Sequence, residues 1–177
     1  MNEALGYRLF ERPGMEKSPN YLEVLELAEK VNLVLQEPEI IAAIHDAHKF
    51  GASSHLIQSV ILEPMKLLGF SSERKGLFED MNVAGIRPDY FKPILGGGVI
   101  FEVERGKTIA NNMDLLDVWK THICKEAKHL FLLVPKIRIS KKGSEQKIFF
   151  SVEKRIGTFF LEEALPIDIE TVHLFGY

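Results

Sequence analysis

A glycine-rich turn between two short runs of strand-forming residues, within the stretch 86–107, limits most strongly which folds are open to this chain. Tyr90-Phe91 and the run 99–101 are aromatic or β-branched, as residues in strands commonly are. The three glycines 96–98 between them interrupt any helical or strand periodicity. The pattern therefore predicts a β-hairpin.

Three acidic residues have positions in this predicted hairpin that would bring them together. Glu102 and Glu104 are two residues apart on the second strand, so both face the same side of it. Asp89 follows Pro88, which favours an extended start to the first strand. Carboxylates gathered in this way repel one another unless a divalent cation or a proton lies among them. The pattern therefore predicts a metal site.

The spacing of these residues resembles the motif of a known family. Pro88-Asp89, twelve further residues and then Glu102-Val103-Glu104 are similar to the motif of the PD-(D/E)XK nuclease superfamily, which has the restriction-endonuclease-like fold. The resemblance implies that Asp89, Glu102 and the carbonyl of Val103 bind Mg²⁺, with Mn²⁺ as a substitute. It implies Mg²⁺-dependent hydrolysis of phosphodiester bonds in nucleic acid, as in a DNA endonuclease.

The chain departs from the family at the position of its usual lysine. Glu104 stands there, and the resemblance assigns it the role of orienting or deprotonating the attacking water. Some members of the superfamily carry the lysine on the following helix, so Lys120 is the candidate for the cation near the phosphate. Lys107, just past the second strand, is the alternative.

The segment 55–68 is predicted to be a helix that is capped by Ser53 or Ser54, kinked or split at Pro64 and ended by Gly69. It resembles the first core helix of the superfamily, which ends in a leucine-rich turn followed by Leu-Gly and an aromatic residue. That helix carries a supporting Glu near its start. The polar residues available here are His55, Gln58 and Glu63. The sequence leaves open which of them faces the site, and the alternative for each is an exposed position on a polar helix face.

Length and composition set the broad class. A chain of 177 residues predicts one domain, with residues 1–52 as an arm and helices before an α/β core at 53–177. The net charge of −3 argues against strong non-specific binding to DNA, although metal-bound carboxylates would offset part of it. The single cysteine, Cys124, excludes an intrachain disulfide. With no signal peptide and no apolar run of membrane-spanning length, we expect a cytoplasmic protein without membrane contact.

The first part of the chain predicts an arm followed by two helices. Residues 1–19 are interpreted as a loose arm, and a helix capped by Asn20 follows and ends before Pro38. A second helix is expected over 38–50, with Pro38 in its first turn. His45 and His48 lie on one face of that helix, where they could form a zinc site or have an exposed or capping role. The polar segment 71–85 is expected to be irregular.

The second half predicts a helix and a buried strand after the hairpin. The helix covers 113–127, with Asn111 or Asn112 as its cap. The apolar run 129–135 indicates a strand buried on both faces, hence a parallel β-α-β unit. A helix is favoured over 144–160, although the aromatic residues there would also suit a hairpin, and a final strand over 167–175 follows. We therefore expect a three-layer α/β/α sandwich around a small mixed sheet, with an N-terminal helical extension. The expected apolar face of the 113–127 helix consists of Leu115, Leu116, Trp119 and Ile123.

Basic residues near 136–147 predict a nucleic-acid-binding lip, with DNA as the favoured partner, and the alternative is a solvated loop. The sequence leaves open whether two copies of the chain form a homodimer. The main alternative function is a catalytically inactive protein of the same fold that serves as a nucleic-acid-binding or assembly module. A glycosidase with two carboxylates is a third class, for which Trp119 alone is weak support. The residues of the predicted lip are Lys136, Arg138, Lys141 and Lys142.

Overall fold

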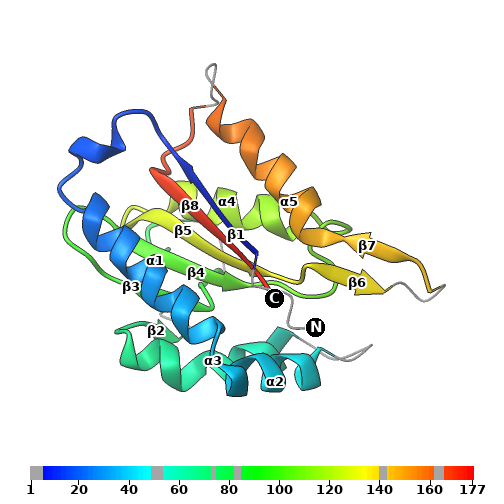
Figure 1. The fold of residues 1–177 in the computed structure, drawn as a ribbon. Coiled ribbons are helices and arrows are strands. Elements are labelled where there is room, and N and C mark those ends of the chain that lie inside the picture. The colour runs from blue at the N-terminus through cyan, green and yellow to red at the C-terminus, as the bar shows by residue number, and fades with distance from the viewer. Residues whose placement is uncertain (1–5, 49–53, 73–74, 82–84, 140–142, 162–165) are drawn as a thin grey trace.

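The computed structural model describes residues 6–48, 54–72, 75–81, 85–139, 143–161 and 166–177, which form a mixed α/β fold (Figure 1). Six strands make the main sheet: β1 (Gly6–Glu11), β2 (Ser71–Ser72), β3 (Tyr90–Lys92), β4 (Gly98–Val103), β5 (Ala127–Val134) and β8 (Thr171–Gly176). Two more, β6 (Ile137–Ile139) and β7 (Glu145–Lys147), form a separate hairpin. The helices are α1 (Tyr21–Leu35), α2 (Pro38–Ala47), α3 (Ser54–Leu67), α4 (Met113–Ile123) and α5 (Ile148–Gly157), with 3-10 turns η1 (Met15–Lys17) and η2 (Thr158–Phe160).

The strand order in the main sheet is β1-β8-β5-β4-β3-β2. β4 and β8 both run parallel to β5, whereas the other three pairs are antiparallel. The sheet is therefore mixed, as expected, and the α/β class is confirmed.

Helices cover both faces of this sheet (Figure 1). On one face, Phe101 and Phe131 share a core cluster with buried residues of α1, α2 and α3. On the other, Ile100 and Leu132 pack with buried residues of α4 and α5. Each strand contributes alternate residues to the two clusters because successive side chains point to opposite faces. α1 is thus packed directly onto the sheet.

The predicted hairpin is confirmed, and its turn explains its glycines. β3 pairs antiparallel with β4, with Tyr90 opposite Phe101. A Cβ atom at Gly98 would lie 2.6 Å from the ring of Phe91 and 2.7 Å from the main-chain oxygen of Glu126, so only glycine fits there. The strands are shorter than the sequence suggests. Asp89 lies directly before β3, and Glu104 directly after β4.

The buried strand that the apolar run predicts is also confirmed. β5 is parallel to β4, and α4 lies between them in the chain. Every residue of β5 except Lys128 is buried. β5 is flanked by parallel strands on both sides, which accounts for its nearly continuous apolar sequence.

The prediction of a loose arm over residues 1–19 is wrong for residues 6–11, and residues 1–5 of that arm lie outside the described residues. Residues 6–11 form β1, which pairs with β8 along its whole length, from Gly6 opposite Gly176 to Glu11 opposite Thr171. The hydroxyl of Tyr7 also lies 2.8 Å from Nδ1 of His173, within hydrogen-bonding distance. The partner strand lies at the far end of the chain, so no local pattern could indicate this pairing.

Two predicted helix starts differ in detail from the structure. Asn20 makes no side-chain cap for α1; its amide oxygen accepts a hydrogen bond from Ser18 Oγ at 2.5 Å, and its amide nitrogen donates to His129 Nε2 at 3.1 Å. Asn112 precedes α4 in the left-handed region, again without a side-chain cap. Arg155 Nη2 donates to Asn112 Oδ1 at 2.6 Å, so both asparagine side chains bond to other polar groups instead of capping a helix.

Other boundaries differ as well. α3 is one continuous helix across Pro64, and Gly69 follows it with a left-handed φ of 88°, as predicted for its end. Pro38 lies in the first turn of α2 as expected; residues 49 and 50 of that predicted helix, and Ser53, lie outside the described residues. The segment 71–85 begins with β2 rather than being wholly irregular. The segment 144–160 divides into β7, α5 and η2, and β8 begins four residues later than predicted.

Candidate functional site: a buried carboxylate cluster

The face of α4 that packs against the sheet is not the predicted apolar one. Leu116 and Trp119 are 47% and 43% exposed, so this part of the prediction is wrong. Leu115 and Ile123 are partly buried, and Ile123 packs against the core, whereas two carboxylates turn inward with them. The buried residues of α4 are Asp114, Asp117, Val118 and Thr121.

Hydrogen bonds connect the carboxylates around the hairpin and α4. Asp89 Oδ2 accepts a hydrogen bond from the main-chain N–H of Val103 at 2.9 Å, and Glu102 Oε2 lies 3.4 Å from the main-chain nitrogen of Asp89. Lys120 Nζ donates to Glu102 Oε1 at 2.8 Å and to Asp117 Oδ1 at 3.3 Å. Asp89, Glu102, Asp117 and Lys120 thus form one group, named here the carboxylate cluster.

Burial governs the charge states in the carboxylate cluster. Glu102 and Asp117 are 3% and 1% exposed. Burial and the repulsion from Asp117 raise the pKa of Glu102 well above its ordinary value. Burial likewise raises the pKa of Asp117 to about 6, although Lys120 opposes that shift. Burial alone would lower the pKa of Lys120, but Glu102 and Asp117 raise it above its ordinary value. The ammonium is therefore held charged among acids that repel one another.

Asp89 reaches the start of α3 as well as the hairpin. Burial raises the pKa of Asp89, while the N–H of Val103, then Lys120 and a hydrogen bond from the Gln58 side chain lower it. His55 also lowers this pKa. Of the three candidates on α3, His55 and Gln58 therefore lie close to Asp89. Glu63 instead pairs with Lys66 at 2.7 Å, with its side chain 75% exposed.

Glu104 lies beside the carboxylate cluster, at the end of β4. Its N–H donates to the carbonyl of Leu133 at 2.8 Å, and its carbonyl accepts a hydrogen bond from the Tyr177 hydroxyl at 3.1 Å. Burial raises the pKa of the Glu104 side chain to about 8, and repulsion from Asp117 and Asp89 adds to this. The carboxyl is therefore largely protonated at neutral pH. Lys107, the alternative cation, is exposed.

Asp114 and Asp117 are the residues of this site that the sequence reasoning missed. Asp114 is fully buried, and its Oδ2 lies 3.2 Å from Arg155 Nε, an ion pair that connects α4 to α5. Asp117 Oδ2 is buried and has no hydrogen-bond partner. One signal in the sequence could have found Asp117, because it lies three residues before Lys120 on the same helical face.

The predicted basic lip is described only in part. Lys136 follows β5, and Arg138 lies in β6, which belongs to the hairpin that projects from the main sheet (Figure 1). Both side chains are partly exposed. Lys141 and Lys142 lie outside the described residues.

The donor chemistry of the carboxylate cluster suits a hard divalent cation. Carboxylate oxygens are the ligands that Mg²⁺ prefers, and Asp117 Oδ2 is a buried acceptor without a donor. As the side chains lie, however, the described residues contain no group of three or more His, Cys, Asp or Glu arranged to hold a metal ion. Lys120 lies between Glu102 and Asp117 instead. An ion would therefore have to displace this ammonium from at least one of them.

Comparison of the sequence with models of known protein families and with curated proteins found no match in either case. In the described part of the chain, no helix has the length and apolar character needed to cross a membrane.

Proposed function

We propose that this protein is a metal-dependent phosphodiesterase that cleaves nucleic acid, specifically a DNA endonuclease with the restriction-endonuclease-like α/β/α sandwich. One observation carries the proposal: the hairpin and α4 bring Asp89, Glu102, Asp117 and Lys120 into a single buried group. Support also comes from the helices on both faces of the mixed sheet and from a lysine on the helix that follows the hairpin.

In this proposal Asp89 and Glu102 hold Mg²⁺ or Mn²⁺, with the carbonyl of Val103 as a further ligand and Asp117 as an additional one. The bound ion supplies the polarisation of the phosphate and of the attacking water. The N–H of Val103 holds Asp89 in place, because it donates to the Oδ2 atom of that carboxylate. Asp89 is thereby oriented from the same strand that carries Glu102.

Lys120 and Glu104 have complementary roles in this proposal. Lys120 offsets the repulsion between Glu102 and Asp117, and its ammonium would contact the phosphate if an ion were held by these carboxylates instead. Glu104 accepts a proton from the water after losing its own. A pKa of about 8 lies in the range that suits a general base working at a mildly alkaline pH.

A binding module without catalysis is the second candidate, and the same cluster gives the observation that favours it. Lys120 already pairs with two carboxylates, so the site is neutralised in part without a metal ion. Such an arrangement can serve purely to hold α4 on the hairpin. In that case, Lys136 and Arg138 would carry the binding of nucleic acid.

A cleavage assay separates the two candidates. Purified wild type, Asp89→Asn and Asp80→Asn would be incubated with supercoiled plasmid and with single-stranded DNA, in Mg²⁺, in Mn²⁺ and in EDTA. Asp80 is a matched control, because it is an exposed acid that pairs with Lys125 on the surface. Cleavage by wild type and Asp80→Asn in metal only, with none by Asp89→Asn, supports the nuclease. Absence of cleavage by wild type in both metals refutes it and leaves the binding module.

A further inference from the structure

The main sheet has one edge that is long enough to accept a further strand. β2, at one end of the strand order, has only two residues, and so short an edge strand offers little for another chain to pair with. β1, at the other end, has six residues and pairs with β8 without a bulge. It contains no proline or lysine, and none of its residues is buried. The outer edge of β1 can therefore pair with a strand from another molecule.

Alternate residues of β1 direct their main-chain groups away from β8. The N–H of Arg12 donates to the carbonyl of Glu170 at 3.0 Å, and this pair continues the register of β1 and β8 by one step. Because hydrogen-bonded pairs alternate along an antiparallel ladder, the N–H and C=O groups of the even-numbered residues of β1 also face β8. Those of Tyr7, Leu9 and Glu11 therefore point outward. In the described part of the chain, β1 pairs with no strand other than β8.

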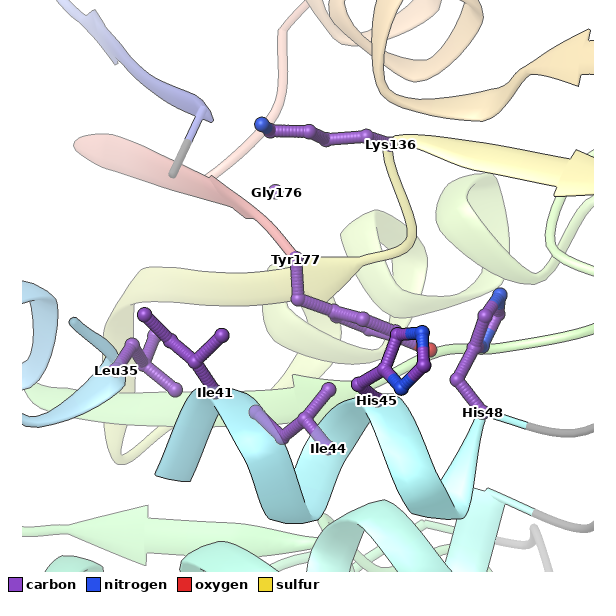
Figure 2. A pocket seen from close by; sticks show the side chains of 8 residues that line it. All are labelled: Leu35, Ile41, Ile44, His45, His48, Lys136, Gly176 and Tyr177. Carbon is purple, nitrogen blue, oxygen red and sulfur yellow. The ribbon is translucent and has the colours of Figure 1, made fainter. Parts of the chain in front are cut away.

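This outer edge is a separate surface from the pocket at the end of β8. The pocket has a volume of about 240 Å³ and lies between α2 and Tyr177 (Figure 2). His45 and His48, which the sequence offers as a zinc pair, both line it. Gly176 of β8 also lines the pocket, but no residue of β1 does. Changes at the outer edge of β1 therefore leave the pocket intact.

The sequence of β1 is complementary to itself in one antiparallel register. With a two-fold axis at Leu9, each Leu9 lies opposite Leu9 of the second copy, each Tyr7 opposite a Glu11 and each Arg8 opposite a Phe10. The outward N–H and C=O groups of all three odd-numbered residues then have partners. Arg8 lies beside an aromatic ring, which is favourable for a cation, and no like charges are directly opposite one another. A second copy of this chain therefore fits the edge in both hydrogen bonds and charge.

The position of α5 allows two copies to come together at this edge. The ring of Phe149 in α5 packs against glycines of both β1 and β8, so α5 lies over these two strands. A two-fold axis at Leu9 places the two α5 helices two strand spacings apart, about 10 Å. Packed helices have axes about 8–10 Å apart, so the two α5 helices would touch without overlapping. Glu153 of α5 pairs with Arg8 of β1, and Phe150, three residues earlier on the same side of the helix, is 50% exposed. Contact between the helices would cover part of that ring.

We propose that two copies of this chain form a homodimer, in which the β1 strands pair antiparallel across a two-fold axis at Leu9 and join two six-stranded sheets into one. The interface is small, because it consists mainly of one strand and one helix from each copy. We therefore expect a Kd in the micromolar range. The proposal is independent of the nuclease activity, because no residue of β1 belongs to the carboxylate cluster.

Sedimentation velocity of the full chain, from about 5 to 300 µM and in EDTA, tests the proposal. Wild type should change from monomer towards dimer over this range. Leu9→Lys places two like charges opposite one another at the axis and should weaken the dimer by about tenfold or more. Leu33→Lys is the matched control, because Leu33 is 58% exposed on α1, and it should leave the dimer unchanged. Wild type that stays monomeric at about 300 µM, or a dimer unaffected by Leu9→Lys, overturns the proposal.

A charge swap distinguishes a contact at the axis from a general loss of the fold. Leu9→Glu alone should weaken the dimer as Leu9→Lys does. An equimolar mixture of the two variants should form a heterodimer about tenfold or more tighter than the dimer of either variant alone, because opposite charges then meet at the axis. Circular dichroism checks that both variants are folded. A mixture that dimerises no better than its components overturns the proposal.

Amide exchange in the wild type tests the register without any substitution. The N–H of Leu9 is free in the monomer and hydrogen-bonded in the dimer, so NMR should show it exchanging about twofold or more slowly at about 300 µM than at about 20 µM. The N–H groups of Arg8 and Phe10 face β8 in both states, so their exchange rates should change less. This measurement still decides the matter if the charged variants are unfolded, because an exchange rate at Leu9 that is independent of concentration refutes the pairing.

Discussion

Replacing Lys120 by Met tests whether the carboxylate cluster depends on an internal cation. Met keeps the length and apolar stem of the lysine but removes the ammonium that lies 2.8 Å from Glu102 Oε1 and 3.3 Å from Asp117 Oδ1. The side chains of Lys120, Glu102 and Asp117 are only 18%, 4% and 1% exposed, so water cannot take over the role of the ammonium.

The expected loss of stability follows from this burial. Removing one partner of a buried ion pair costs about 3–5 kcal/mol, because the other charge is left without compensation. Glu102 can relieve part of that cost by taking up a proton, since its pKa is already raised well above the ordinary value. We therefore expect Lys120→Met to lose about 2–3 kcal/mol in the free energy of unfolding. For a chain of this length, that corresponds to a fall of about 5–10 °C in Tm.

Urea denaturation at pH 7, followed by circular dichroism, measures this loss in the absence and presence of Mg²⁺. Lys125→Met is the matched control, because Lys125 and its partner Asp80 are both exposed and we expect little change. Mg²⁺ should stabilise Lys120→Met more than wild type, since the competing ammonium is gone. If Lys120→Met loses no more stability than Lys125→Met, the account of the cluster as a buried ion pair is refuted. An equal effect of Mg²⁺ on wild type and Lys120→Met would show that no ion competes with Lys120.

Further predictions concern catalysis, nucleic-acid binding and acid stability. In a plasmid cleavage assay, Glu104→Gln should lower the rate by about two orders of magnitude with only modestly weaker Mg²⁺ binding, because in the proposed mechanism it removes a base and not a ligand. Asp89→Asn should abolish both cleavage and Mg²⁺ binding. Glu104→Lys, which introduces the residue common in the resembled family, should retain activity. Equal cleavage by wild type, Glu104→Gln and Asp89→Asn would place the site elsewhere. In fluorescence anisotropy with labelled DNA, replacing Lys136 and Arg138 by Ala should reduce the slope of log affinity against log salt by about 2, and an unchanged slope excludes them from phosphate contact. Burial lowers the pKa of His129 to about 4, so the folded protein keeps the ring neutral while the unfolded chain binds a proton. Urea denaturation should therefore show stability falling by up to about 3 kcal/mol as the pH drops from about 6.5 to 4, with no further loss from this group below pH 4; a curve unchanged by His129→Gln would contradict this.

Local patterns in the sequence predicted the parts of the fold that depend on local chemistry. The hairpin depends on a turn of glycines, and Gly98 has no space for a side chain. β5 is visible as an apolar run because both its faces are covered. The acids Asp89 and Glu102 were found because the hairpin sets them opposite one another. Each of these features is encoded within about twenty residues of sequence.

The parts of the fold and of the site that the sequence did not predict depend on partners distant in the chain. β1 has no distinctive local pattern, because its stability comes from pairing with β8. The sequence did not indicate Asp117 as a site residue, because the apolar side chains of an amphipathic helix normally face the core. In α4, however, Leu116 and Trp119 are exposed. A helix that buries carboxylates next to a lysine on the same face breaks that rule. Functional sites are where such exceptions are expected.

The pairing of β1 with β8 also determines when the sheet can be completed during synthesis. β1 leaves the ribosome early, but residues 171–176, which form its partner, emerge about 160 residues later, since Glu11 pairs with Thr171. Until then β5 lacks its neighbour β8, and its backbone edge and apolar side chains have no cover on that side. Closing so long a loop is slow, because its entropy must be lost before the contacts form. A nascent chain stalled before residue 171 therefore presents an open edge to other chains, and this intermediate is the one that we expect chaperones to bind.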